Sequence, residues 1–367
     1  MKPRPFALAI LLTLATRATA ADVPTANVEG QPLGANVGRV IEALELLGTP
    51  LPGEVVKDLK TAATNRDAKL LQSLLDPHVL LAVSINPEAR VKVERGPAKA
   101  ALQQAGYTPA LVKVLNAAGV TPALDISSPQ AGAAYHGTAL LSMQRQEQLE
   151  LLRVQRDGDL GSRFLSVEMF RDPPMTGSLS GLEVEYAIAL IYSNESGRRE
   201  ATIGFDLGQQ NQDLGFRGET PLLFDIRPAQ PVSLRILDHD GQPTTARLTI
   251  RDAAGRVHPP QARRLAPDFF FQPHLYRNDG EIVLLPPGRY AVESSRGPEY
   301  RVQRRTLDVN ERGDTVWDFR LERWIDTVKY GFYSGDHHIH AAGCAHYTKP
   351  TEGVSPGDMF RQVKGEG

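Results

Sequence analysis

The chain has few features that would crosslink it or hold it in a membrane. Its 367 residues include one cysteine, Cys344, so no disulfide can form within the chain. Its 41 lysines and arginines are balanced by 43 aspartates and glutamates without a basic stripe, which argues against nucleic acid as a partner. Beyond residue 20, no apolar run is long enough for a membrane helix. The chain therefore depends on apolar cores, and its length allows two or three domains.

The first 20 residues have the layout of a secretory signal. Lys2 and Arg4 precede a short apolar run at 6–15, small residues follow at 18–20, and cleavage is expected after Ala20. Removal of the three basic residues of this segment takes the formal net charge from -2 to -5. Export without disulfides is typical of a bacterial periplasm or cell surface, so we expect a secreted or periplasmic protein. An uncleaved membrane anchor is the alternative.

Helical periodicity follows a short leader. Residues 21–35 are small, polar and aperiodic, and we expect them to be flexible. From Val37 onward, apolar residues recur at a spacing near 3.6 in three blocks, which Gly48 and Pro77 help to delimit. The sequence predicts a small helical segment over 36–78 and gives no sign of chemistry there.

At Val79 the period of the apolar residues changes to two, and residues 79–228 are predicted to form a β-rich domain. The clearest strand is 182–192, whose apolar side chains share one face, and 201–207 alternates in the same way after the turn sequence SNESG. This pattern predicts a hairpin with one buried face. A helix is predicted over 138–154.

Residues 229–323 show many short strands with regular turn signals, which is typical of an antiparallel sandwich. The segments DGQP, ARLTIRDAAGR and LPPGRYAV resemble the carboxypeptidase-regulatory-like β-sandwich, a resemblance of fold alone. DHDG at 238–241 predicts a plain turn, with a calcium loop as the alternative. The phenylalanines at 269–271 are expected to fill the core or meet a neighbouring domain, and a substrate-pocket role for His274 is the alternative to packing.

Four of the nine histidines lie between residues 337 and 346. The segment 330–340 is predicted to be a short strand that runs into a loop, which would align Asp336, His338 and His340 on one side. Two adjacent neutral imidazoles suit zinc, manganese, iron or nickel, and Asp336 would bind the metal or orient its ligands. The metal would lower the pKa of a bound water. Solvated or hydrogen-bonded histidines at a strand end are the alternative.

Two further side chains follow in the same loop. Cys344 and His346 have the chemistry for contact with the metal or with a substrate, because a thiol so near a metal is able to coordinate it. Packing within the loop is the alternative for both residues.

The segment GDHHIHAAG resembles the first motif of the PHP superfamily, named for its polymerase and histidinol phosphatase domains. That motif, Asp-x-His-x-His, ends the first strand of a distorted (β/α)7 barrel. More closely, the chain resembles the exported carbaryl-hydrolase-like (CehA/McbA) branch of these metallohydrolases. The resemblance lies in the residues from 335 to 367 and in LSGLEVEYAIALIYS, RLAPDFFFQPHLYR and SRGPEY.

The resemblance implies a metal-dependent hydrolase. His338 and His340 take the positions of the metal ligands, with zinc, manganese or iron as the divalent metal, and Asp336 takes the catalytic acidic position. His337 stands where relatives often have leucine, and no ligand role is carried to it. The implied reaction is cleavage of an ester, carbamate or phosphoester bond through metal-activated water. The implied substrate is a small molecule or a polysaccharide-associated ester.

The expected fold is mainly β, with a small N-terminal helical segment. Antiparallel β-sandwich domains would lead, at 324–367, into the first strand and helix of a truncated PHP-type (β/α)7 barrel. Ser355 and Pro356 predict the start of that helix.

Such a barrel needs roughly 200 residues, so we expect the N-terminal part of a longer hydrolase that is inactive alone, with about thirty poorly anchored residues at its end. The alternative is a secreted β-sandwich module that binds a polysaccharide or a protein, in which the histidines are incidental. The sequence leaves the oligomeric state open.

Overall fold

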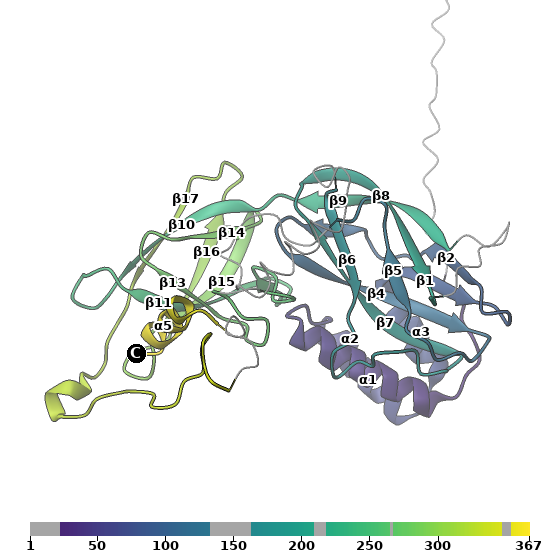
Figure 1. The fold of residues 1–367 in the computed structure, drawn as a ribbon, viewed down its shortest axis with the longest axis horizontal. Helices are drawn as coiled ribbons and strands as arrows, with labels where there is room; N and C mark the ends of the chain where they lie inside the picture. Colours follow the sequence, from purple (N-terminus) through teal and green to yellow (C-terminus); the bar gives the residue numbers. More distant parts are fainter. Residues whose placement is uncertain (1–22, 133–162, 209–217, 265–266, 347–353) are drawn as a thin grey trace, which may run out of the picture.

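The computed structural model describes residues 23–132, 163–208, 218–264, 267–346 and 354–367. Within these ranges the chain is mainly β, with two units of packed sheets and a few helices (Figure 1). The predicted signal at 1–20 and the predicted helix at 138–154 lie outside the described residues. In the part of the chain that is described, no helix is both long and apolar enough to cross a membrane.

Three helices and a short 3-10 turn open the described chain and confirm the helical segment. They are α1 (Gly30–Leu46), α2 (Gly53–Thr64), α3 (Ala68–Leu75) and η1 (Asp76–His78). Helix α1 begins inside the range that was expected to be a flexible leader, because Leu33 already belongs to the buried stripe that continues through Val37 and Val40. Before the helix, the backbone N–H of Ala26 donates to the Gln72 side chain, so the leader is tied down as well.

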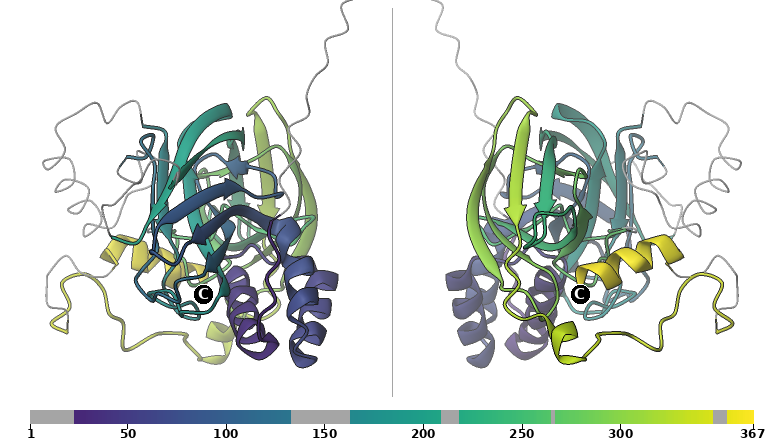
Figure 2. Two further views of the ribbon diagram at one scale, coloured as in Figure 1. Left: turned by 90° about the vertical axis from the view of Figure 1, so that its right-hand side faces the viewer. Right: turned by 90° about the vertical axis from the view of Figure 1, so that its left-hand side faces the viewer.

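The first unit has three layers. Its larger sheet has the order β2 (Val91–Arg95), β1 (Val79–Ile85), β4 (Tyr107–Asn116), β7 (Val184–Ser193) and β6 (Leu165–Met169). Its smaller sheet has the order β3 (Ala101–Gln103), β9 (Glu219–Arg227), β8 (Gly197–Asp206) and β5 (Asp125–Ser127). One apolar core joins the helices to the larger sheet and another joins the two sheets, and Figure 2 shows the helices on the outside.

The predicted hairpin in this unit is wrong. β7 pairs with β4 and β6, whereas β8 pairs with β5 and β9, so the chain crosses from one sheet to the other between them. β7 is also buried on both faces, since Tyr186 and Ile188 pack toward the helices while Ala189 and Ile191 face the second sheet. The alternating pattern identified the strands correctly but did not specify their partners.

A buried charged group links the helices to the larger sheet. Lys113 on β4 has a fully buried side chain whose Nζ lies 2.9 Å from Asp76 Oδ2 and 2.9 Å from the carbonyl oxygen of Pro24. The Tyr186 hydroxyl donates to the other Asp76 oxygen over 2.8 Å. Burial lowers the pKa of Lys113, while the hydrogen bond and charge of Asp76 act in the opposite direction. Each polar group is therefore paired, as burial requires.

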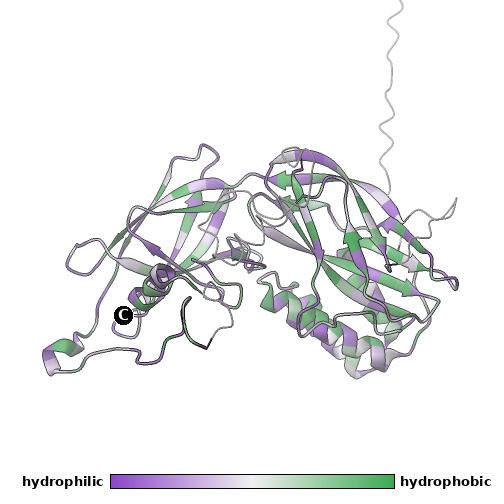
Figure 3. Ribbon diagram, viewed as in Figure 1, coloured by the Kyte–Doolittle hydropathy of each residue, from purple (hydrophilic) through white to green (hydrophobic). Residues whose placement is uncertain are grey.

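The second unit is a two-sheet sandwich around one core. One sheet has the order β14 (Ile282–Leu285), β10 (Gln230–Leu237) and β17 (Thr315–Arg320). The other has the order β12 (Val257–His258), β11 (Thr245–Asp252), β15 (Gly288–Ser295) and β16 (Gln303–Val309), with β13 (Leu275–Asn278) also paired to β11. Apolar and polar residues alternate along these strands (Figure 3). The expected boundary at 228/229 falls between β9 and β10.

The sheets are not purely antiparallel as expected. β1 with β4, β3 with β9, and β10 with β17 are parallel pairs. The three phenylalanines at 269–271 are not part of the sandwich core, and Phe270 and Phe271 are exposed and meet edge to face. Phe270 does meet the neighbouring unit, as expected, because it lines a pocket together with Leu46 and Leu47. The core is instead closed by rings from the strands, among them Tyr290, Trp317 and Phe319.

The final helix, α5 (Pro356–Gly365), is docked on this sandwich rather than poorly anchored. It lies against β11 and β13, and Arg361 forms an ion pair with Glu281. Gly365 packs directly on the ring of Tyr276, and the Tyr276 hydroxyl donates to Glu366 just after the helix. As predicted, Ser355 caps the helix, accepting from the backbone N–H of Asp358 over 3.2 Å.

Candidate metal centre

The histidine-rich segment is a loop held at both ends. It starts after the 3-10 turn η3 (Thr327–Tyr330), where the Glu299 carboxylate accepts from the Thr327 hydroxyl and from the Arg323 guanidinium. Toward its end the Ala342 N–H donates to the carbonyl oxygen of Val354 over 2.7 Å, immediately before α5. The loop therefore leaves and rejoins the same sandwich, which limits the conformations available to it.

The predicted strand at 330–340 is absent from the structure. Residues 327–330 form η3, Gly331 takes a left-handed φ of 81° that ends it, and the residues up to 340 have no regular structure. A strand needs a neighbour to satisfy its backbone groups, and none of the described segments pairs with this one. The first strand of a barrel, expected from the resemblance, is therefore not seen.

The two predicted metal ligands nevertheless meet. Nε2 of His338 lies 2.9 Å from Nε2 of His340, and the ring centroids are 4.8 Å apart. Both side chains are exposed. Two ring nitrogens at this separation cannot both donate, so the pair is compatible with at least one neutral ring that offers a lone pair.

Asp336 has a local role in the structure. Its Oδ1 accepts the backbone N–H of His338 over 3.0 Å, which closes a turn that ends at the first residue of the imidazole pair. The contacts found within the described residues do not include one between this carboxylate and either imidazole. Asp336 thus orients the backbone that carries His338, and its expected catalytic role stays a prediction. His337 has no contact of this kind among the described residues.

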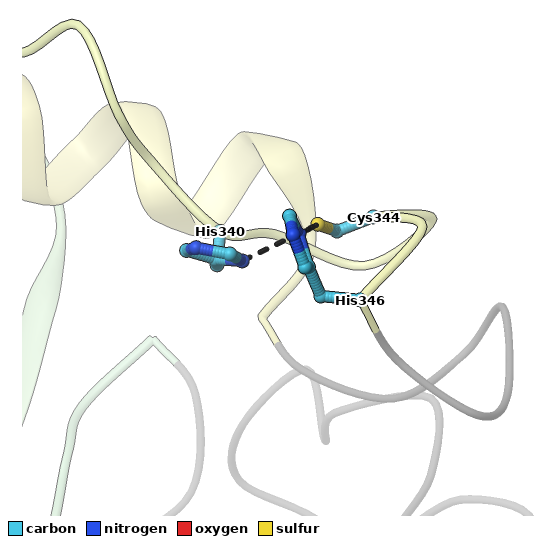
Figure 4. A group of neighbouring side chains, drawn as sticks. All are labelled: His340, Cys344 and His346. Carbon is cyan, nitrogen blue, oxygen red and sulfur yellow. Dashed lines mark hydrogen bonds between the residues drawn. The ribbon is translucent and has the colours of Figure 1, made fainter.

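Cys344 and His346 fold back onto the same ring system (Figure 4). The Cys344 sulfur lies 3.3 Å from Nδ1 of His340 and 3.2 Å from Nδ1 of His346. The rings of His340 and His346 have centroids 4.8 Å apart. The three potential ligand atoms all lie within 4.8 Å of one another. The sequence had left packing and metal contact open for these two residues, and the structure places both beside His340.

The local backbone explains this convergence. The Cys344 N–H donates to the carbonyl oxygen of Ala341 over 3.0 Å, and Gly343 adopts a left-handed φ of 88° within this turn. Such a φ favours glycine because a side chain there would be strained. The turn sends the chain back toward His340, so residues four and six positions later reach its ring.

The donor chemistry fits a transition metal. Imidazole nitrogen and thiol sulfur are the ligands that zinc takes most often in proteins. The rings are exposed and Cys344 is partly exposed, so an ion has access from solvent. The residues present can therefore hold a divalent ion.

The segment DHDG at 238–241 forms the predicted turn, and ligand atoms of Asp238, His239 and Asp240 lie within 4.8 Å of one another. Asp238 accepts the backbone N–H of His239 over 2.7 Å, and its other oxygen is engaged by Arg296 at 2.7 Å and the Tyr300 hydroxyl at 3.0 Å. The Gly241 N–H closes the turn onto the Asp238 carbonyl over 2.9 Å. The Asp238 carboxylate is committed to these protein partners, which argues against the calcium alternative.

His274 lies at the junction with α5. Its Nε2 is 3.1 Å from the Tyr276 hydroxyl. Burial and then the positive charge of Arg247 lower the pKa of His274 to about 4, with Glu366 acting in the opposite direction. His274 is therefore a neutral packing group at neutral pH. This junction was not predictable from local patterns, because its partners lie about 90 residues apart in the chain.

Comparisons with known proteins add little. No family model and no curated protein matches the chain. Among solved structures, it is similar to BcpA, the major pilin subunit of Bacillus cereus, with 11% identity, a TM-score of 0.21 and coverage of 66% of this chain and 67% of that one. The Bacillus anthracis TIE protein gives 11% identity, a TM-score of 0.20 and coverage of 83% and 56%. Likenesses this slight carry no weight for function.

Proposed function

We propose that the chain is the N-terminal part of an exported, metal-dependent hydrolase of the PHP superfamily, in which His338 and His340 hold the metal. The observation that supports this most directly is the 2.9 Å separation of their Nε2 atoms. The two ligand atoms predicted from the motif already converge, although the backbone between them is not a strand. Little rearrangement is needed for both to face one ion.

Chemistry at this position would be hydrolytic. A divalent ion bound there supplies Lewis acidity and an activated water for cleavage of an ester, carbamate or phosphoester bond. His338 and His340 would bind the ion through ring nitrogen. Asp336, by accepting the His338 N–H, fixes the backbone from which the first imidazole projects.

Exposed rings beside the histidines support a larger catalytic domain. Tyr330, Phe332 and Tyr333 are 71%, 70% and 78% exposed. A run of apolar and aromatic side chains left this open typically marks a surface that another protein element covers. This exposure is what we expect if the loop forms one face of a substrate site completed by other elements.

Manganese binding tests the ligand assignment. Free Mn²⁺ is measured by its paramagnetic resonance signal as purified protein is titrated with the ion. We expect the wild type and His337→Ala to take up Mn²⁺, and His338→Ala combined with His340→Ala to lose uptake. His337 is the matched control because it is a histidine directly next to His338 in the same loop. Equal uptake by the double variant and the wild type would contradict the proposal.

A further inference from the structure

The His340 ring faces two different sets of partners with its two nitrogens. Its Nε2 lies 2.9 Å from His338, whereas its Nδ1 lies 3.3 Å from the Cys344 sulfur. His346 completes the second set, with its Nδ1 3.2 Å from the same sulfur (Figure 4). His338 belongs only to the first set. The loop therefore presents two candidate metal positions on opposite sides of one imidazole.

We propose that Nδ1 of His340, Sγ of Cys344 and Nδ1 of His346 form a separate site for a thiophilic divalent ion, of which zinc is the representative. The site itself is independent of the hydrolase proposal, and only the competition described below rests on it. On coordination the Cys344 thiol releases its proton to water and the thiolate binds the ion. Three protein donors leave one position of a tetrahedral ion for water or a further ligand.

The distances suit such an ion. Bond lengths of about 2.0–2.1 Å to nitrogen and about 2.3 Å to sulfur place tetrahedral ligand atoms roughly 3.5 Å apart. The two nitrogen–sulfur separations here are 3.3 Å and 3.2 Å. All three ligand atoms lie within 4.8 Å of one another, so adjustments on the order of 1 Å would seat the ion. The turn at Gly343 that brings Cys344 back is already formed.

The two positions exclude each other at His340. A neutral imidazole has one lone pair, because its other nitrogen carries a proton. His340 thus binds an ion through Nε2 beside His338 or through Nδ1 beside Cys344, and the loop takes one ion at a time. Thiolate favours softer ions such as zinc, whereas manganese prefers harder donors and gains no affinity from the sulfur. A thiophilic ion would capture His340 and displace manganese from the His338 side.

Cobalt reports on the sulfur side, because thiolate coordination gives Co²⁺ a charge-transfer absorption in the near ultraviolet. We expect this band in the wild type, saturating at one ion per chain. It should persist in His338→Ala and His337→Ala and be lost in His340→Ala and His346→Ala. Alkylation of Cys344 by iodoacetamide should be slowed by Zn²⁺ in the wild type and unaffected in His346→Ala. Absence of the band, or its persistence in His346→Ala, would overturn the inference.

Competition separates this inference from the proposed function. In the wild type, Zn²⁺ should release bound Mn²⁺, and in Cys344→Ser this release should require a markedly higher zinc concentration. A thiolate band that depends on His346, in a protein that binds no Mn²⁺, would retain the sulfur site and remove the His338 assignment. Mn²⁺ uptake that depends on His338, without any thiolate band, would retain the His338 assignment and remove the sulfur site.

Discussion

The contact between α5 and the sandwich gives the sharpest test of how the metal loop is held. A Cβ built on Gly365 would lie 1.9 Å from Cδ1 and 2.5 Å from Cε1 of Tyr276. Carbon atoms normally approach to about 3.5–4.0 Å, so Gly365→Ala requires a movement of roughly 1.6 Å or more. Tyr276 is only 2% exposed and has little room to turn away. The helix itself must therefore shift or detach.

The magnitude follows from the cost of overpacking. Forcing one extra carbon into a tight contact costs about 1–3 kcal/mol, and every 1.4 kcal/mol is a factor of ten. Gly357→Ala is the matched control, since it lies in the same helix and its new Cβ would meet only Ser355 Oγ, at 4.0 Å. Both changes remove a helical glycine, so the difference between them isolates the clash.

Hydrogen exchange of the α5 amides is the assay, because it measures local opening. We expect exchange in α5 to be roughly 5- to 150-fold faster in Gly365→Ala than in Gly357→Ala, with the β-strand cores unchanged. Co²⁺ affinity should fall in the same direction, since the loop loses its fixed end. Equal protection in the two variants would refute the docking that we describe.

Two further predictions concern stability. Lys113→Met leaves the Asp76 carboxylate, whose side chain is only 13% exposed, without its cation. It should lower the free energy of unfolding by about 3–5 kcal/mol in denaturant titrations. Lys92→Met, at an exposed ion pair, should cost less than about 1 kcal/mol, and similar costs for both variants would contradict the burial of the Lys113 pair. Burial lowers the pKa of His274 to about 4 in the folded protein, from 6.5 in the unfolded chain. The folded state therefore favours the neutral ring, so the protein's stability is full above pH 6.5 and falls as pH drops from 6.5 toward 4. His274→Gln should flatten the melting temperature over that window, and an unchanged slope would argue against burial of the neutral ring.

Local elements were predictable because local interactions decide them. Helix α5 begins at Ser355 as expected, since the cap needs only a side chain and an N–H three residues later. The three early helices follow from apolar spacing in the same way. Helix α1 begins before the predicted residue 36, because its first turn contains Gly30 and polar residues and its buried apolar face begins only at Leu33.

Strand partners were not predictable from alternation. β7 and β8 have the pattern of a hairpin, yet each pairs within a different sheet. Alternation states that one face of a strand is apolar, and it is satisfied equally by any partner that keeps that face covered. One face of β7 was expected to be exposed to solvent, but the helices α1 to α3 cover it.

The candidate site was predictable in part. The spacing of His338 and His340 indicated a pair of imidazoles, and their rings do meet, although through a loop rather than a strand. The approach of Cys344 and His346 depends on the left-handed turn at Gly343. A sequence pattern shows that a glycine permits such a turn, but it does not show which ring the turn faces.

The number of ions bound per chain decides whether the histidine loop is a metal site. The whole chain, freed of metal and then equilibrated with zinc or manganese, is weighed by mass spectrometry under native conditions. We expect one ion per wild-type chain with either metal, no manganese in His338→Ala combined with His340→Ala, and retention of zinc in His338→Ala alone. A wild-type chain that carries no ion, or a double variant that carries as much manganese as the wild type, would contradict this expectation.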